Sequence, residues 1–135
     1  MPTAYLTRRA TFSASHRLHS IKLSKEENIK LFGKCNNPNG HGHNYILEVS
    51  IRGEIDEKTG MVMNLSDLKE VIEENAIFKL GHKHLNLDVP EFKALNPTAE
   101  NIATVIWKFL KPKLKNLLYE IRLVESENNS VVYRG

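Results

Sequence analysis

The stretch HGHNYILEVSIR, residues 41–52, decides most of what the sequence says about the fold. From Tyr45 to Ile51 every second residue is apolar, and most of the residues between them are polar. This period of two predicts a β-strand with one face turned to a hydrophobic core. His41 and His43 stand at the start of this strand with one glycine between them, so we expect both imidazoles on the same face.

The residues before this strand predict a second strand and a short helix. Tyr5–His16 is rich in Thr, Phe and Tyr, which favours a strand. Ser24 and Glu27 have the spacing of a capping box, so a helix is expected to run from there to Phe32. Residues 33–40 are rich in Asn, Pro and Gly and are expected to form a loop.

The residues after this strand predict two helices and two further strands. Asn64 is expected to cap the first helix, and Thr98 the second. Pro112 is expected to end the second helix, because proline lacks the backbone N–H that the next turn needs. Two closing strands are expected on either side of an Asn128–Asn129 turn, at Tyr119–Glu125 and Ser130–Tyr133.

The order of these elements predicts an α+β fold in a single domain, residues 1–135. Strands joined by short turns favour a four-stranded antiparallel sheet, and two amphipathic helices would cover one of its faces. A sheet this small has open edges, which oligomerisation could cover.

Composition narrows the class of protein. Hydrophobic residues make up 41% of the chain and charged residues 26%, which is typical of a soluble globular domain. The net charge of +3 suits an anionic substrate, but no dense Lys/Arg block indicates a nucleic acid partner. One cysteine, no leader-like apolar run and no membrane-spanning stretch lead us to expect a cytoplasmic protein without disulfides.

The histidines raise the question of a metal site. His41 and His43 could bind one ion from the same strand face, and His16 ends the neighbouring predicted strand. Three histidines with an open fourth position are typical of a catalytic zinc site. The alternative is that His41 and His43 are solvent-exposed residues beside a turn.

Cys35 and Glu125 also allow two interpretations each. Cys35 lies in a polar loop after a lysine, where a thiolate nucleophile or base is possible, but a small buried hydrophobic residue is equally possible. Glu125 shares a strand face with Ile121 and Leu123, so it could anchor an N–H-rich heterocycle by a bidentate hydrogen bond. It could equally be a solvated residue at the end of the strand.

Several stretches together resemble the 6-pyruvoyl-tetrahydropterin synthase family, and the similarity covers essentially the whole chain. They are residues 12–18 (FSASHRL), 32–45 (FGKCNNPNGHGHNY), 60–65 (GMVMNL), 96–101 (NPTAEN) and 132–135 (VYRG). The cysteine-to-histidine stretch is the most specific of them.

This resemblance implies a tunnelling fold, in which the sheets of ββααββ subunits join into a barrel within a homohexamer of two trimers. It implies a zinc-dependent carbon–oxygen lyase that converts 7,8-dihydroneopterin triphosphate to 6-pyruvoyl-tetrahydropterin, a step of tetrahydrobiopterin biosynthesis. No nucleic acid or membrane partner is implied. By position, the zinc ligands would be three histidines, namely His16, His41 and His43.

The resemblance also assigns the remaining site residues. Cys35 would be the general base and His82 its catalytic partner. Glu125 would anchor the pterin, and Thr98 and Glu100 would make further pterin contacts.

One departure from the family pattern lies next to His82. The family usually has an aspartate immediately before this histidine, whereas this chain has Gly81. Loss of the orienting carboxylate costs on the order of 10⁴ in rate in a serine protease triad, so a pterin-binding protein without turnover is one alternative. Another is a 6-carboxy-tetrahydropterin synthase of queuosine biosynthesis, which residues 82–86 and 96–100 resemble. A third is a structural zinc module.

Overall fold

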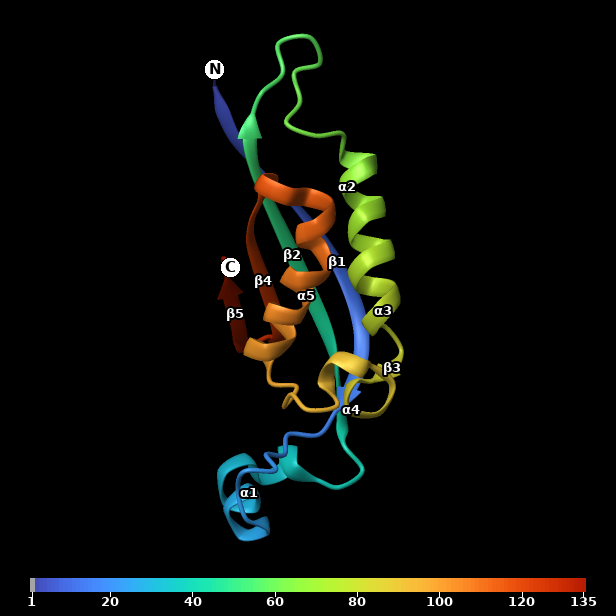
Figure 1. The fold of residues 1–135 in the computed structure, drawn as a ribbon, viewed down its shortest axis with the longest axis vertical. Helices are drawn as coiled ribbons and strands as arrows, with labels where there is room; N and C mark the ends of the chain where they lie inside the picture. Colours follow the sequence, from blue (N-terminus) through green and yellow to red (C-terminus); the bar gives the residue numbers. More distant parts are fainter. Residues whose placement is uncertain (1) are drawn as a thin grey trace.

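The fold is built on one mixed β-sheet. The computed structural model describes residues 2–135, and Figure 1 shows the sheet crossing the body of the molecule. Its strand order is β3-β1-β2-β4-β5. The strands are β1 (Thr3–His16), β2 (His41–Glu54), β3 (Lys83–His84), β4 (Leu118–Ser126) and β5 (Asn129–Tyr133).

The expectation of four antiparallel strands was wrong in one respect. The four long strands pair antiparallel, but the two-residue strand β3 adds a fifth that runs parallel to β1. Ala14 pairs with Lys83 and Ser15 with His84. Two residues are too few to show a period of two, so no sequence pattern marks this strand.

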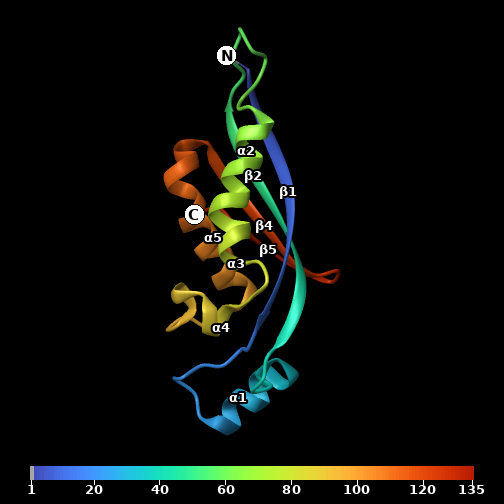
Figure 2. The ribbon, with the colours of Figure 1, turned by 90° about the vertical axis from the view of Figure 1, so that its right-hand side faces the viewer.

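Both long helical segments cover the same face of the sheet, as Figure 2 shows. The first begins with α2 (Leu65–Ile72), continues through one π-helical turn, η2 (Glu73–Ile77), and ends with α3 (Phe78–Leu80). The second is α5 (Ala99–Leu114). Asn64 and Thr98 cap α2 and α5 as predicted, because each side chain accepts a hydrogen bond from a backbone N–H of the first turn.

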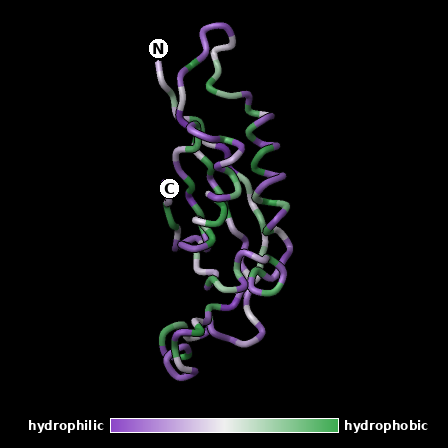
Figure 3. Tube along the Cα trace, viewed as in Figure 1, coloured by the Kyte–Doolittle hydropathy of each residue, from purple (hydrophilic) through white to green (hydrophobic). Residues whose placement is uncertain are grey.

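The core lies between the sheet and these helices. In Figure 3 hydrophobic and hydrophilic residues alternate along the strands and along the helices that pack on them. Most of the largest fully buried side chains come from β2, β4 and both helical segments, and they include Tyr45, Leu47, Ile51, Leu68, Ile72, Ile102, Ile106, Ile121 and Leu123. The face of β2 that the alternation assigns to the core is therefore the buried one.

Two predicted boundaries were wrong. Helix α5 continues through Pro112 to Leu114. The proline removes the hydrogen bond to the carbonyl of Lys108, but both residues are exposed, so water can satisfy that carbonyl. The turn between β4 and β5 lies at residues 127–128, because Asn129 already pairs with Ser126.

Residues 17–40 form an arm that extends from the end of the sheet (Figure 1). It contains α1 (Lys25–Phe32) and the 3₁₀ turn η1 (Gly33–Asn36). The predicted capping box is present, since Ser24 and Glu27 bond each other's backbone N–H groups. The short helices α4 (Leu85–Asp88) and η3 (Pro90–Phe92) lie between β3 and α5, and η4 (Lys115–Leu117) follows α5.

Across residues 2–135, no helix has both the length and the apolar character needed to cross a membrane.

Candidate metal centre

Three histidines converge at the end of the sheet from which the arm extends. His16 is the last residue of β1 and pairs directly with His41, the first residue of β2. His43 follows two residues later, so its side chain projects from the same face as that of His41. One potential ligand atom from each of the three lies within 4.8 Å of the others. The antiparallel register therefore brings together the three predicted ligands.

The spacing of the ring nitrogens fits a metal ion. The Nε2 atoms of His16 and His41 are 3.2 Å apart. Zn–N bonds of 2.0–2.1 Å in a tetrahedron separate two ligand nitrogens by about 3.3 Å. Within residues 2–135, Nδ1 of His41 and Nε2 of His43 are buried without a hydrogen-bond partner. A cation among the three rings would satisfy the buried Nε2 of His43, and the residues present therefore fit a bound metal.

The surroundings of His16 favour metal binding through its Nε2. Its side chain is fully buried, and its Nδ1 donates a 2.7 Å hydrogen bond to the carbonyl oxygen of Pro97. This bond places the ring proton on Nδ1 and leaves the lone pair of Nε2 free for a metal. Burial is the main cause that lowers the pKa of His16 to about 4, and the neighbouring His41 and His43 lower it further. The ring is therefore neutral at neutral pH.

Glu125 lies close to the triad. β4 pairs with β2 through Val124 and Ile46, which places Glu125 beside the start of β2. Burial raises the pKa of the Tyr45 phenol, and the negative charge of Glu125 raises it further. Burial and His43 lower the pKa of His41, and the charge of Glu125 opposes them. The carboxylate is thus close enough to act on both rings.

Thr98 and Glu100 lie at the start of α5. The Thr98 side chain is half-buried and accepts the Asn101 backbone N–H at 3.2 Å. Thr98 also follows Pro97, whose carbonyl holds His16. Glu100 is an exposed residue of the first helical turn. Their predicted pterin contacts stay predictions.

Cys35 lies in the arm, within η1, and is half-buried. Its carbonyl oxygen accepts the backbone N–H of Leu18 at 2.9 Å, which ties η1 to the chain just after His16. Among the described residues the candidate metal ligands are the three histidines, without Cys35.

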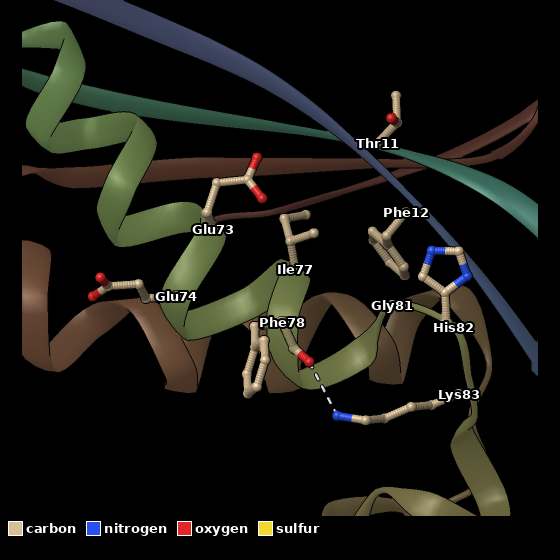
Figure 4. Close-up of a pocket in the computed structure, with 9 residues that line it drawn as sticks. All are labelled: Thr11, Phe12, Glu73, Glu74, Ile77, Phe78, Gly81, His82 and Lys83. Atoms are coloured by element: carbon tan, nitrogen blue, oxygen red, sulfur yellow. Dashed lines mark hydrogen bonds between the residues drawn. The ribbon is translucent and has the colours of Figure 1, made fainter.

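His82 lies on the other side of β1, next to β3. It has a φ of 59°, and its backbone N–H bonds the carbonyl oxygen of Ser13. Its exposed ring borders a cavity of about 790 Å³, which Figure 4 shows between β1 and the helix end. Three strand spacings separate β3 from β4, or about 14 Å. One chain therefore does not bring His82 next to Glu125.

No carboxylate takes the place of the family aspartate beside His82. A Cβ atom at Gly81 would lie 2.9 Å from the carbonyl oxygen of Ile77, so a side chain there requires that carbonyl to move. Asp88, six residues after His82, bonds another group, since its Oδ2 accepts the backbone N–H of His84 at 2.9 Å. Within residues 2–135 no protein group bonds the His82 ring.

Three residues of this region were missed by the sequence interpretation. Tyr45 shares the strand face of His41 and His43, and its position two residues further along could have indicated it. No sequence pattern indicated His84, yet its charge acts on His16 and its Nδ1 is buried without a partner among the described residues. The bond from His16 to Pro97 spans 81 residues of sequence, and no local pattern predicts it.

Comparison with known proteins gives one consistent result. Residues 5–135 match the sequence profile of the family described as 6-pyruvoyl tetrahydropterin synthase. Proteins named 6-pyruvoyl tetrahydrobiopterin synthase from Dictyostelium discoideum and Homo sapiens are each 56% identical over 133 residues, covering 98% of this chain and 97% and 92% of theirs. The solved structure of the 6-pyruvoyl tetrahydropterin synthase of Caenorhabditis elegans is 43% identical. It superposes with a TM-score of 0.96 and covers 100% of this chain and 97% of that one.

Proposed function

Because the chain belongs to the 6-pyruvoyl tetrahydropterin synthase family, we propose that it converts 7,8-dihydroneopterin triphosphate to 6-pyruvoyl-tetrahydropterin with release of triphosphate. Such an enzyme is a carbon–oxygen lyase. The observation that carries the proposal is the histidine triad, in which His16 is buried and His41 and His43 are half-buried, with a carboxylate beside it at a site whose residues fit a metal ion. The catalytic interpretation is favoured over a structural zinc module, because the hydrophobic core between the sheet and the helices is large enough to hold the fold without a metal.

His16, His41 and His43 would hold the zinc ion. When bound, zinc supplies a Lewis acid that polarises the side-chain hydroxyls of the substrate and makes the adjacent C–H more acidic. The protein supplies the imidazoles, and the bond of His16 to Pro97 fixes the orientation of one of them.

Glu125 would anchor the pterin ring. A carboxylate can accept two parallel N–H bonds from the aminopyrimidinone edge of a pterin, which sets both its position and its orientation. The Glu125 carboxylate lies next to the triad, so an anchored ring would present its side chain to the metal. Thr98, which follows the carbonyl that holds His16, and Glu100 are proposed to make further contacts to the ring.

Cys35 is proposed as the base that removes the side-chain proton, and His82 as the second acid/base group. Since His82 and Glu125 lie on opposite sides of the β1–β2 pair, we propose that they meet across an interface between copies of the chain. The outer edges of β1 and β5 have no sheet partner among residues 3–12 and 129–133. Pairing these edges would join the sheets into a barrel, as expected of a homohexamer of two trimers.

Complementation tests this arrangement. His82→Ala and Glu125→Gln variants should each be inactive alone. Mixed after unfolding and refolding together, they should regain part of the wild-type activity, because some interfaces would then hold one intact copy of each residue. No recovery in a correctly assembled mixture would contradict a shared site.

Mass spectrometry of the products tests the proposed reaction. The zinc-loaded protein is incubated with 7,8-dihydroneopterin triphosphate, and a 6-pyruvoyl product with free triphosphate is expected. A 6-carboxy product would instead assign the chain to the queuosine branch. Unchanged substrate would refute the proposed activity for the wild-type chain.

A second candidate function rests on Gly81. Without a carboxylate to orient His82, the protein would bind the pterin but turn it over slowly. Comparing Gly81→Asp with Gly81→Asn separates charge from crowding, since both add the Cβ atom that contacts the Ile77 carbonyl. This candidate would be supported if Gly81→Asp, but not Gly81→Asn, greatly raised the rate. For scale, loss of the equivalent carboxylate in a protease triad lowers the rate by about 10⁴. An active wild type that neither variant improves would exclude it.

A further inference from the structure

We propose that a cavity of about 480 Å³ beside the metal centre binds the oligophosphate end of the substrate. The cavity lies between the segment after β1 and the segment before α5, and it is separate from the triad and from Glu125. This assignment rests on the proposed function, since it identifies where the triphosphate of that substrate binds.

The charges around the cavity are of one sign. Arg17, Lys22 and Lys93 line it, together with two histidines, His19 and His84. No carboxylate is among the lining residues in the part of the chain that the structure describes. A triphosphate carries several negative charges, so such a cluster attracts it and favours it over an uncharged ligand.

Arg17 is held in place for this role. Its Nε donates a 3.0 Å hydrogen bond to the carbonyl oxygen of Asn36, and its backbone N–H and carbonyl both bond the side chain of Asn86. Within residues 2–135 the terminal nitrogens of the guanidinium have no protein partner. A guanidinium fixed at Nε with free terminal N–H groups is well suited to two phosphate oxygens.

The side chains of His19 and Asn96 add further donors. Asn36 Nδ2 bonds the Leu18 carbonyl at 2.7 Å and lies 3.0 Å from His19 Nδ1, so His19 must accept at Nδ1 and carry its proton on Nε2. Asn96 accepts the His19 backbone N–H through Oδ1, which leaves its Nδ2 without a partner among the described residues. The His19 ring and the Asn96 amide therefore offer N–H groups at the cavity.

The cavity adjoins the triad along both segments that form it. Arg17 directly follows His16, and Asn96 directly precedes Pro97, whose carbonyl bonds His16. Neighbouring Cα atoms are about 3.8 Å apart. A ligand whose polar side chain lies over the metal would therefore bring its terminal phosphates to Arg17 and Asn96.

Binding of inorganic tripolyphosphate tests the assignment. Binding of unphosphorylated 7,8-dihydroneopterin is measured in parallel as the control for the pterin part of the site. The zinc-loaded wild type is compared with Arg17→Gln and with the double variant Lys22→Gln/Lys93→Gln, and zinc content is measured for each. Both lysines are exposed, so the double variant is expected to fold. Lys108→Gln, an exposed position on α5 outside the cavity, is the matched control.

Both cavity variants should bind tripolyphosphate at least 10-fold more weakly than the wild type, with unchanged affinity for dihydroneopterin and unchanged zinc content. Lys108→Gln should match the wild type. Equal tripolyphosphate affinity in wild type and cavity variants would overturn the assignment. A loss of tripolyphosphate affinity that occurs only together with a loss of bound zinc would overturn it as well. If the wild type binds tripolyphosphate in this cavity but fails to convert the pterin substrate, the subsite stands and the proposed reaction falls.

Discussion

Asn28 connects the two halves of the arm, and its replacement by alanine should open the arm. Asn28 is fully buried, and its side chain contacts the backbone of Ser20, Leu23 and Ser24. The arm carries Cys35, and the segment just before α1 carries residues of the proposed phosphate cavity. Loosening it should therefore affect substrate turnover as well as local stability.

The size of the effect follows from the hydrogen bonds. Oδ1 accepts the Ser20 N–H at 2.8 Å, and Nδ2 lies 2.9–3.3 Å from three carbonyl oxygens. Nδ2 has only two hydrogens, so the amide makes the equivalent of three bonds. At about 1 kcal/mol each, Asn28→Ala should destabilise the closed arm by about 3 kcal/mol. At 1.36 kcal/mol per factor of ten, that is an increase of about 100-fold in arm opening.

Hydrogen exchange followed by mass spectrometry measures this opening. Peptides covering residues 17–36 should lose about two orders of magnitude in protection, whereas peptides from β2 and β4 should keep theirs. Asn75→Ala is the matched control, because the Asn75 amide makes a single 2.8 Å bond to the Val71 carbonyl. The hydrogen-bond argument is wrong if Asn28→Ala leaves the protection of the arm unchanged. It is also wrong if Asn28→Ala lowers the protection of the arm no more than Asn75→Ala lowers protection around Val71.

Three other predictions concern the site. Glu125→Gln should weaken pterin binding at least 10-fold in a fluorescence titration, because it loses a charge-assisted bidentate acceptor, and unchanged affinity would exclude the anchor role. Gly40→Ala should lower the free energy of unfolding by about 1–3 kcal/mol in urea and reduce zinc stoichiometry. Gly40 has φ +80°, and an added Cβ would lie 2.9 Å from His84 Nε2 and 3.0 Å from the His16 carbonyl. The double variant Gly40→Ala/His84→Ala should recover only part of the lost free energy of unfolding. Full recovery would show that the contact with the His16 carbonyl and the φ angle of Gly40 cost no stability. Chelation of the metal should leave the far-ultraviolet circular dichroism unchanged while abolishing product formation, and loss of the folded signal would indicate a structural metal instead.

Local signals in the sequence were sufficient for most elements of the fold. The alternation from Tyr45 to Ile51 predicted which face of β2 is buried. Ser24 and Thr98 predicted where α1 and α5 begin, because a cap depends on hydrogen bonds within one turn. His41 and His43 were placed on one face by the same period of two. These features depend only on residues a few positions apart, which is why the chain alone determines them.

Contacts between distant segments were decided only by the tertiary structure. The parallel pairing of β3 with β1 needs the whole α2–α3 segment to return to the sheet edge, and two residues carry no periodic signal of it. The bond from His16 to Pro97, the position of Glu125 beside His41, and the separation of His82 from Glu125 depend on register and packing. The sequence by itself thus determined the residue types, their faces and the family. The packing of segments far apart in the chain decided which of those residues share one site.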